Sequence, residues 1–161
     1  MKSDFPDLLK RLNEFGVEYI LVGGMAANIH GSTITTLDCD IVVSLGIDNL
    51  SKLAQALSVY SPTFRHKKPP QAFDEEMAVR NGSKSIYLDT SAGILDCLGD
   101  IKGLGDFAEC NGRSLEVDLG GFSIRVLTRE ALIEAKKAMG RPKDLLTVAQ
   151  LEIGGELEGS A

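Results

Sequence analysis

The stretch Tyr19-Ile20-Leu21-Val22-Gly23-Gly24, followed by Asp38-Cys39-Asp40-Ile41-Val42-Val43, decides the fold of this chain. The first segment is an apolar run ending in two glycines, which predicts a buried strand over 17–22 that breaks into a short helix over 25–30. The second segment predicts a strand over 39–43 that opens with two carboxylates. Because side chains alternate faces along a strand, we expect Asp38 and Asp40 to point the same way, with Cα atoms roughly 6.5–7 Å apart.

This pairing of glycines with carboxylates has a chemical meaning. Two carboxylates on one face repel each other unless a cation lies between them. A glycine turn at the start of a helix exposes backbone N–H groups to an anion. Together the two segments predict a metal-bound phosphate site.

Length and composition are those of an ordinary globular domain. The chain has 161 residues, of which 43% are hydrophobic and 25% charged. It contains neither an apolar run long enough to span a membrane nor an N-terminal secretory signal, so we expect a cytoplasmic protein without membrane contact. The three cysteines lack metal-type spacing and are expected to be reduced, with Cys39 and Cys97 buried in strands.

The charge of the chain limits its partners. A net charge of −6 argues against non-specific DNA binding, which needs many cations to neutralise phosphates. Two basic segments, 65–68 and 136–143, stand out in this acidic chain. They suit a nucleoside triphosphate or one strand of RNA, although 65–68 is more typical of an ordinary solvated face.

The remaining pattern predicts an α/β (α+β) protein with a mixed β-sheet and helices packed on it. Apolar spacing indicates helices over 5–15 and 50–57, and a further helix begins at Thr128 and ends at Gly140. Strands are expected over 85–89 and 93–98, and Gly120-Gly121 predicts a hairpin between 114–119 and 122–127. A last helix runs from Pro142 to roughly Leu151. We expect one domain over 1–153 and a flexible tail over 154–161.

A third carboxylate lies in the predicted strand 93–98. Asp96 is flanked by apolar residues, where a lone carboxylate is costly to bury. If this strand lies beside the one that carries Asp40, Asp96 completes a metal cluster and can promote deprotonation of an incoming hydroxyl. Asp89 and Asp100 are the competing candidates for this position, and both are expected to be more solvated.

These residues resemble a family. Two glycines, a short helix, Asp-x-Asp on the next strand and a third Asp on a later strand are similar to the signature of the polymerase-β-type nucleotidyltransferases. The match is nearest to their small prokaryotic toxin-like and abortive-infection members. It extends to the segments 21–32, 36–43 and 93–99, and to Leu132-Ile133, Lys136 and 140–145, so that it covers roughly residues 17–150.

The resemblance implies a minimal nucleotidyltransferase fold and a metal-dependent transfer of NMP from ATP or another NTP to an acceptor, with release of pyrophosphate. It implies Mg²⁺ or Mn²⁺ as the cofactor, and RNA (such as tRNA), a protein or a small molecule as the acceptor. An antitoxin or other partner protein is also implied. The residues that it assigns are Asp38, Asp40 and Asp96 as catalytic metal ligands, and Gly23, Gly24, Ser32, Lys136 and Lys143 as nucleotide-binding residues. Many relatives carry an arginine where this chain has Ile34, so the alternative is a catalytically inactive nucleotide- or partner-binding module of the same fold.

Overall fold

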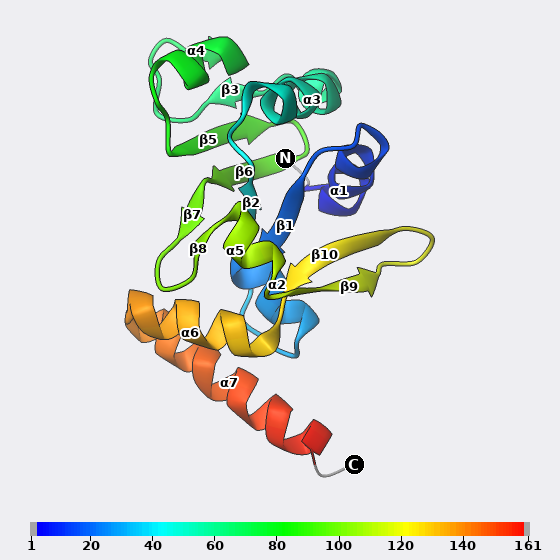
Figure 1. Cartoon of the computed structure of the whole chain (residues 1–161), viewed down its shortest axis with the longest axis vertical. Coiled ribbons are helices and arrows are strands. Elements are labelled where there is room, and N and C mark those ends of the chain that lie inside the picture. Colours follow the sequence, from blue (N-terminus) through cyan, green and yellow to red (C-terminus); the bar gives the residue numbers. More distant parts are fainter. Residues whose placement is uncertain (1–2, 160–161) are drawn as a thin grey trace.

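A mixed eight-stranded sheet in the order β4-β3-β5-β6-β2-β1-β10-β9 forms the centre of the molecule (Figure 1). The computed structural model describes residues 3–159, with side chains through residue 156. The strands are β1 (Tyr19–Val22), β2 (Asp38–Val43), β3 (Thr63–Phe64), β4 (Gln71–Ala72), β5 (Ser85–Thr90), β6 (Gly93–Leu98), β9 (Ser114–Asp118) and β10 (Ser123–Leu127). A separate two-stranded sheet pairs β7 (Asp100–Ile101) with β8 (Gly105–Asp106). The predicted mixed sheet is therefore confirmed.

Seven helices surround the sheets within the described residues. They are α1 (Phe5–Glu14), α2 (Gly23–Ile29), α3 (Ile47–Leu57), α4 (Glu75–Arg80), α5 (Phe107–Asn111), α6 (Arg129–Met139) and α7 (Pro142–Gly159), with a 3₁₀ turn η1 (Ser58–Tyr60). Figure 1 shows α1 and α3 near one another at one end of the molecule, and α6 and α7 crossing at the other end. No helix within residues 3–159 combines the length and the apolar character needed to cross a membrane.

The central strands bring the two predicted carboxylate strands together. β2 runs antiparallel to β1 and parallel to β6, so the strand that carries Asp96 lies directly beside the one that carries Asp40. One face of these strands is packed with apolar side chains, including Cys39 and Ile41 of β2, which are fully buried. Asp38 and Asp40 are only partly buried and alternate with them, which places both carboxylates on the opposite face.

Local signals explain the start of α1 and both ends of α6. Asp4 caps α1 by accepting a hydrogen bond from the Asp7 backbone N–H at 3.3 Å. Thr128 caps α6 in the same way through Ala131, and Gly140 ends that helix in the left-handed region at φ +69°. Both α6 boundaries agree with the prediction from the sequence.

The structure differs from the sequence prediction in three regions. No element was predicted between α3 and β5, where the structure has β3, β4 and α4, or between β6 and β9, where it has β7, β8 and α5. At the C-terminus, α7 continues past the predicted end near Leu151 to Gly159, so residues 154–159 are helical where a flexible tail was predicted. Buried Thr147, Val148 and Leu151 anchor the preceding turns of this helix, which continues through the two glycines 154 and 155. Residues 160–161 of the predicted tail lie outside the described residues.

Candidate active site

Gly23 lies where β1 ends and α2 begins, in contact with the first carboxylate strand. Its φ of +69° is in the left-handed region, which glycine adopts without strain. A Cβ atom at this position would overlap the Oδ2 atom of Asp40. At Gly24, a Cβ atom would come within 2.9 Å of the Thr36 Cβ atom. The two glycines therefore allow the backbone turn to pack directly against β2 and the segment before it.

The register of the sheet puts the carboxylates beside this turn. Asp40 is opposite Val22 on β1 and opposite Asp96 on β6. Asp38 lies two residues earlier on the same face of β2, where it is opposite Ile94. The sheet thus brings Gly23, Asp40 and Asp96 into one row, with Asp38 adjacent.

The ionisation of Asp40 reflects this crowding. Burial raises its pKa to about 6, and the charge of Asp96, a hydrogen bond shared with that carboxyl and the charge of Asp38 act in the same direction. The ammonium group of Lys136 opposes this rise. The face of the sheet at Asp40 is therefore rich in negative charge, with one cation close enough to offset part of it.

Arg65 is a site residue that the sequence did not single out. It follows β3, its backbone N–H donates to the Tyr87 carbonyl at 2.9 Å, and its Nη2 atom lies 2.5 Å from Oδ1 of Asp96. The two side chains are only 18% and 13% exposed, so the interpretation of 65–68 as an ordinary solvated face is wrong for Arg65. His66, Lys67 and Lys68 are exposed as expected.

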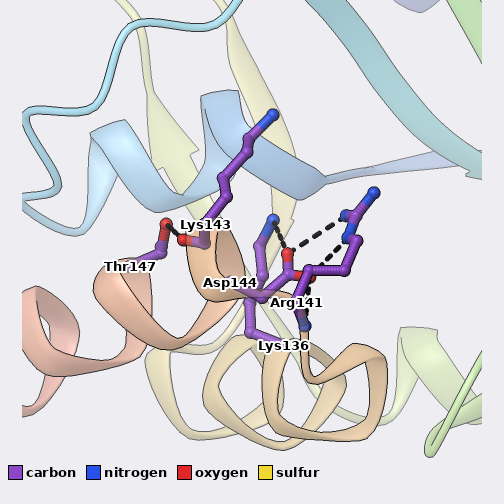
Figure 2. A network of polar contacts seen from close by, with 5 residues as sticks. All are labelled: Lys136, Arg141, Lys143, Asp144 and Thr147. Carbon is purple, nitrogen blue, oxygen red and sulfur yellow. Dashed lines mark hydrogen bonds and ion pairs between the residues drawn. The ribbon is translucent and has the colours of Figure 1, made fainter.

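A second group of charged residues lies where α6 meets α7 (Figure 2). The carboxylate of Asp144 is fully buried and accepts hydrogen bonds from Arg141 Nε at 2.6 Å and from the Arg141 backbone N–H at 3.3 Å. Lys136 Nζ lies 3.5 Å from the same carboxylate. The hydrogen bond from Arg141, followed by the charge of Lys136, holds the pKa of Asp144 below its ordinary value. Asp144 therefore fixes two cations at the edge of the site.

A cavity of about 210 Å³ joins the two groups. Its polar lining includes Gly23, Asp40, Lys136 and Arg141. Its apolar lining comes from β1, β6, β7, β10 and α6, and includes Val22, Leu98, Leu132 and Met139. A molecule with a flat apolar ring and a polyanionic group matches this division of the lining, since the ring can lie on the apolar wall while the anion faces the cations.

The other predicted site residues lie elsewhere. The Ser32 hydroxyl donates to Gln150 Oε1 on α7 at 2.9 Å, and it accepts from the Ile34 backbone N–H at 3.3 Å. Figure 2 shows the Lys143 side chain extending away from Asp144, while its carbonyl accepts a hydrogen bond from Thr147. Neither Ser32 nor Lys143 lines the cavity. Of the competing carboxylates, Asp89 is exposed on β5, and Asp100 is exposed at the cavity rim.

The fit of a divalent cation can be judged from the donors. Asp38 and Asp40 offer the oxygen ligands that Mg²⁺ and Mn²⁺ prefer, on a face with excess negative charge. Within residues 3–159, however, no three His, Cys, Asp or Glu side chains converge as a metal-binding group. The residues thus fit a cation at Asp38 and Asp40, and the assignment of all three carboxylates as metal ligands stays a prediction.

Comparisons with known proteins bear on the fold. At the level of sequence, neither a protein-family model nor a curated protein matches the chain. The structure resembles that of ANT(2″)-Ia in complex with adenylyl-2″-tobramycin, with a TM-score of 0.61 and 16% identity over 94% of this chain and 88% of that one. It also resembles the lincosamide antibiotic adenylyltransferase LnuA bound to lincomycin, with a TM-score of 0.60 and 17% identity over 94% of this chain and 98% of that one.

A third similar structure is a nucleotidyltransferase candidate from Thermotoga maritima, with a TM-score of 0.57 and 17% identity over 90% of this chain and 88% of that one. Identities this low establish the fold and not the activity. The chain therefore has the fold of nucleotidyltransferases, as the resemblance in its sequence implied.

Proposed function

We propose that this protein is a metal-dependent nucleotidyltransferase that moves an NMP from an NTP to an acceptor hydroxyl or phosphate. The observation that supports this proposal best is the row formed by Gly23, Asp40 and Asp96 beside a cavity with two fixed cations. A phosphate cradle, acidic ligands and a proton acceptor are the parts that phosphoryl transfer requires. The nucleotidyltransferase fold of the chain is consistent with this chemistry.

Each residue has a distinct role in the proposed reaction. The Gly23–Gly24 backbone and the side chains of Lys136 and Arg141 bind the triphosphate, while Asp38 and Asp40 hold Mg²⁺ or Mn²⁺. The bound cation would neutralise charge on the phosphate oxygens. An acceptor oxygen attacks the α-phosphorus and forms a new P–O bond. The bond between the α-phosphorus and the oxygen that bridges it to the β-phosphate breaks, and pyrophosphate leaves. Asp96 accepts the proton of an attacking hydroxyl.

Ser32 and Lys143 take different parts in this proposal. Ser32 supports the loop after α2 by its hydrogen bond to Gln150, so its effect on the nucleotide is indirect. Lys143 is exposed on α7, where it suits contact with a bound acceptor rather than with the phosphates. The similar structures carry an adenylylated aminoglycoside and a lincosamide, so small hydroxyl compounds join RNA and protein among the acceptor classes to be tested.

Incorporation of label tests the proposal. Each of four α-³²P-NTPs is incubated with Mg²⁺ and with total RNA, the protein itself, or aminoglycoside and lincosamide mixtures. We expect label that depends on Mg²⁺ and is lost in Asp38→Asn and Asp40→Asn. Asp89→Asn is the matched control, since Asp89 is an exposed carboxylate on the same sheet, and it should retain activity. Retained transfer in purified Asp40→Asn would contradict the proposal.

A cellular role as a toxin restrained by an antitoxin is a further part of the proposal. Growth arrest on expression that is lost with Asp38→Asn would support this role, and harmless expression of the active enzyme would contradict it.

The second candidate function is a binding module without catalysis. Ile34 offers no phosphate contact where relatives carry arginine, and Arg65 already pairs with Asp96. NTP binding by calorimetry without pyrophosphate release, for every acceptor class, would favour this second function.

A further inference from the structure

The loop that joins α2 to β2 leads directly into the strand that carries Asp38 and Asp40. Its residues 32–37 contain no charged side chain and form no helix or strand. Backbone N–H and C=O groups in such a segment need partners from elsewhere in the fold. The amide side chains of Asn28 on α2 and Gln150 on α7 supply several of these partners.

Gln150 holds this loop through three hydrogen bonds. Its Oε1 atom accepts from the Ser32 hydroxyl and from the Thr33 backbone N–H, both at 2.9 Å. Its Nε2 atom donates to the Thr33 hydroxyl at 3.0 Å. From the other side, Asn28 Nδ2 donates to the carbonyl groups of Ser32 and Ile34, at 3.0 and 2.9 Å. The conformation of the loop therefore depends on both α2 and α7.

Thr36 connects this part of the loop to the candidate active site. Its hydroxyl donates to the Asp38 carbonyl at 3.3 Å. It also packs against the glycine turn, where a Cβ atom at Gly24 would lie 2.9 Å from the Thr36 Cβ atom. Because Thr36 is only three positions after Thr33, a displacement of the loop at Gln150 also moves Thr36. The glycine turn and the first carboxylate of β2 would then lose their present alignment.

The position of Gln150 itself is set by the packing of α7. Its neighbours on the helix, Thr147, Val148 and Leu151, are buried. Figure 1 shows α7 crossing α6, and these two helices pack against each other. A side chain on a helix anchored in this way is a more rigid support than one on a loop. The packing of α7 on α6 therefore determines where Gln150 holds the loop.

We propose that Gln150 is a positioning residue, which holds the 32–37 loop and thereby keeps Asp38 and the Gly23–Gly24 turn in the arrangement that binds metal and nucleotide. This inference rests on the proposed function and deepens it, because it makes the geometry of the active site depend on a contact with α7. Gln150 does not line the cavity, so its effect on the reaction is exerted through the loop.

Hydrogen exchange of the full chain, followed by mass spectrometry, tests the contact without any need for catalysis. Gln150→Leu removes all three hydrogen bonds at similar side-chain size, so we expect the amides of residues 32–36 to exchange at least tenfold faster. Gln150→Glu keeps oxygen acceptors for the Ser32 hydroxyl and the Thr33 N–H, and should change this exchange less than threefold. Gln150→Ala provides the same test if Gln150→Leu does not fold. Gln55→Leu, at an exposed position on α3, is the matched control and should leave the exchange of the loop unchanged.

Mn²⁺ affinity, measured by electron paramagnetic resonance, tests whether the loop positions the metal strand. We expect Gln150→Leu to weaken Mn²⁺ binding at least threefold and Gln150→Glu to stay within twofold of wild type. Val148→Ala separates positioning from stability, because it removes buried packing on α7 and leaves the hydrogen bonds of Gln150 in place. It should lower the denaturation midpoint at least as much as Gln150→Leu does, with Mn²⁺ affinity within twofold of wild type.

The failures of the inference and of the proposed function differ in these experiments. Unchanged exchange of residues 32–36 in folded Gln150→Leu would overturn the inference and leave the proposed function standing, as would faster exchange with unchanged Mn²⁺ affinity. An equal loss of Mn²⁺ affinity in Val148→Ala would also overturn it, because the stability of α7 would then account for the effect. Absence of Mn²⁺ binding by the wild-type protein would overturn the metal site of the proposed function itself.

Kinetics provide a further readout once an acceptor is known. Gln150→Leu should lower kcat/KM for NTP at least tenfold, and Gln150→Glu should retain most of the wild-type value, since small displacements of a positioned group are costly in rate. An unchanged kcat/KM in Gln150→Leu would overturn the inference.

Discussion

Gly23 is the residue at which the fold and the site constrain each other. Its left-handed backbone turns the chain from β1 into α2, and its missing Cβ leaves the space that the Asp40 carboxylate occupies. Any larger residue must therefore strain the turn and also displace a carboxylate. Few positions in the chain require both a left-handed backbone and the absence of a Cβ atom, because a glycine with positive φ is more often in an open turn.

Gly16 provides a matched control for a prediction at Gly23. Both glycines have φ +69°, but a Cβ at Gly16 would meet no atom within 4 Å. We expect Gly16→Ala to cost about 1 kcal/mol in the free energy of unfolding, which is the strain of a left-handed alanine. Gly23→Ala should cost about 1–3 kcal/mol more through overpacking, and it should abolish Mn²⁺ binding and transfer. Urea denaturation of both variants checks this, and equal costs would contradict the clash with Asp40.

The pKa of Asp40 leads to a pH-dependent prediction. Because its pKa in the fold, about 6, is above the ordinary value of about 4, the folded state holds this proton more tightly than the unfolded chain does. The contribution of Asp40 to stability is therefore full below about pH 4 and is lost as the pH rises to about 6. Asp40→Asn, which cannot ionise, should raise Tm relative to wild type more at pH 7.5 than at pH 4.5.

Mg²⁺ should narrow this difference in Tm, since a bound cation stabilises the ionised wild-type site. Asp89→Asn serves as the control and should shift Tm equally at both pH values. A Tm gain for Asp40→Asn that does not depend on pH would show that Asp40 is not the group that titrates.

At the scale of elements, α6 and α7 depend on one buried carboxylate. Asp144 satisfies the backbone N–H that opens α7, and it pairs with Lys136 of α6, whose side chain is 12% exposed. A surface pair, Lys137 with Glu152 at 3.2 Å, joins the same two helices with side chains 57% and 49% exposed. The two pairs therefore differ mainly in how far water screens them.

We expect Asp144→Asn to lower the free energy of unfolding by about 2–3 kcal/mol at neutral pH, since it leaves a shielded ammonium without its counter-charge. Lys137→Met should change it by less than about 0.5 kcal/mol. Because the pKa of Asp144 is lowered in the fold, its contribution is lost only as the pH falls below about 4. Denaturant curves for both variants at pH 7 test this, and similar losses would contradict the role of burial.

Elements also differ in how far the sequence predicts them. The strands of the Gly23–Asp40 segment and the hairpin at Gly120-Gly121 follow from local patterns of apolar residues and turn residues, and the structure confirms them. β3 and β4 have two residues each, too few for any periodicity to appear. The position of Arg65 could not be predicted, because β3 is too short to recognise and only the order β3-β5-β6 brings Arg65 beside Asp96. The complete burial of Asp144 likewise depends on how α6 packs against α7, which no local pattern shows.

For the whole molecule, the three cysteines report on how the core opens. Cys39, Cys97 and Cys110 are fully buried, and they belong to β2, β6 and α5. Cys39 lies between Asp38 and Asp40 in the sequence, on the opposite face of the strand. Labelling of this thiol therefore requires the candidate metal strand itself to separate from the core.

We expect the native protein to react slowly with a thiol reagent at pH 8, and all three thiols to react at once in guanidinium chloride. Burial raises the pKa of Cys110 to about 11 and that of Cys97 well above its ordinary value, so little thiolate forms in the fold.

If labelling requires global opening, Mg²⁺ with a bound NTP should slow the rate of labelling in proportion to the fraction of liganded protein. Mass spectrometry of partly labelled protein assigns the sites. Rapid labelling of Cys39 or Cys97 in the native state would show that the strands carrying Asp40 and Asp96 open independently of the rest of the core.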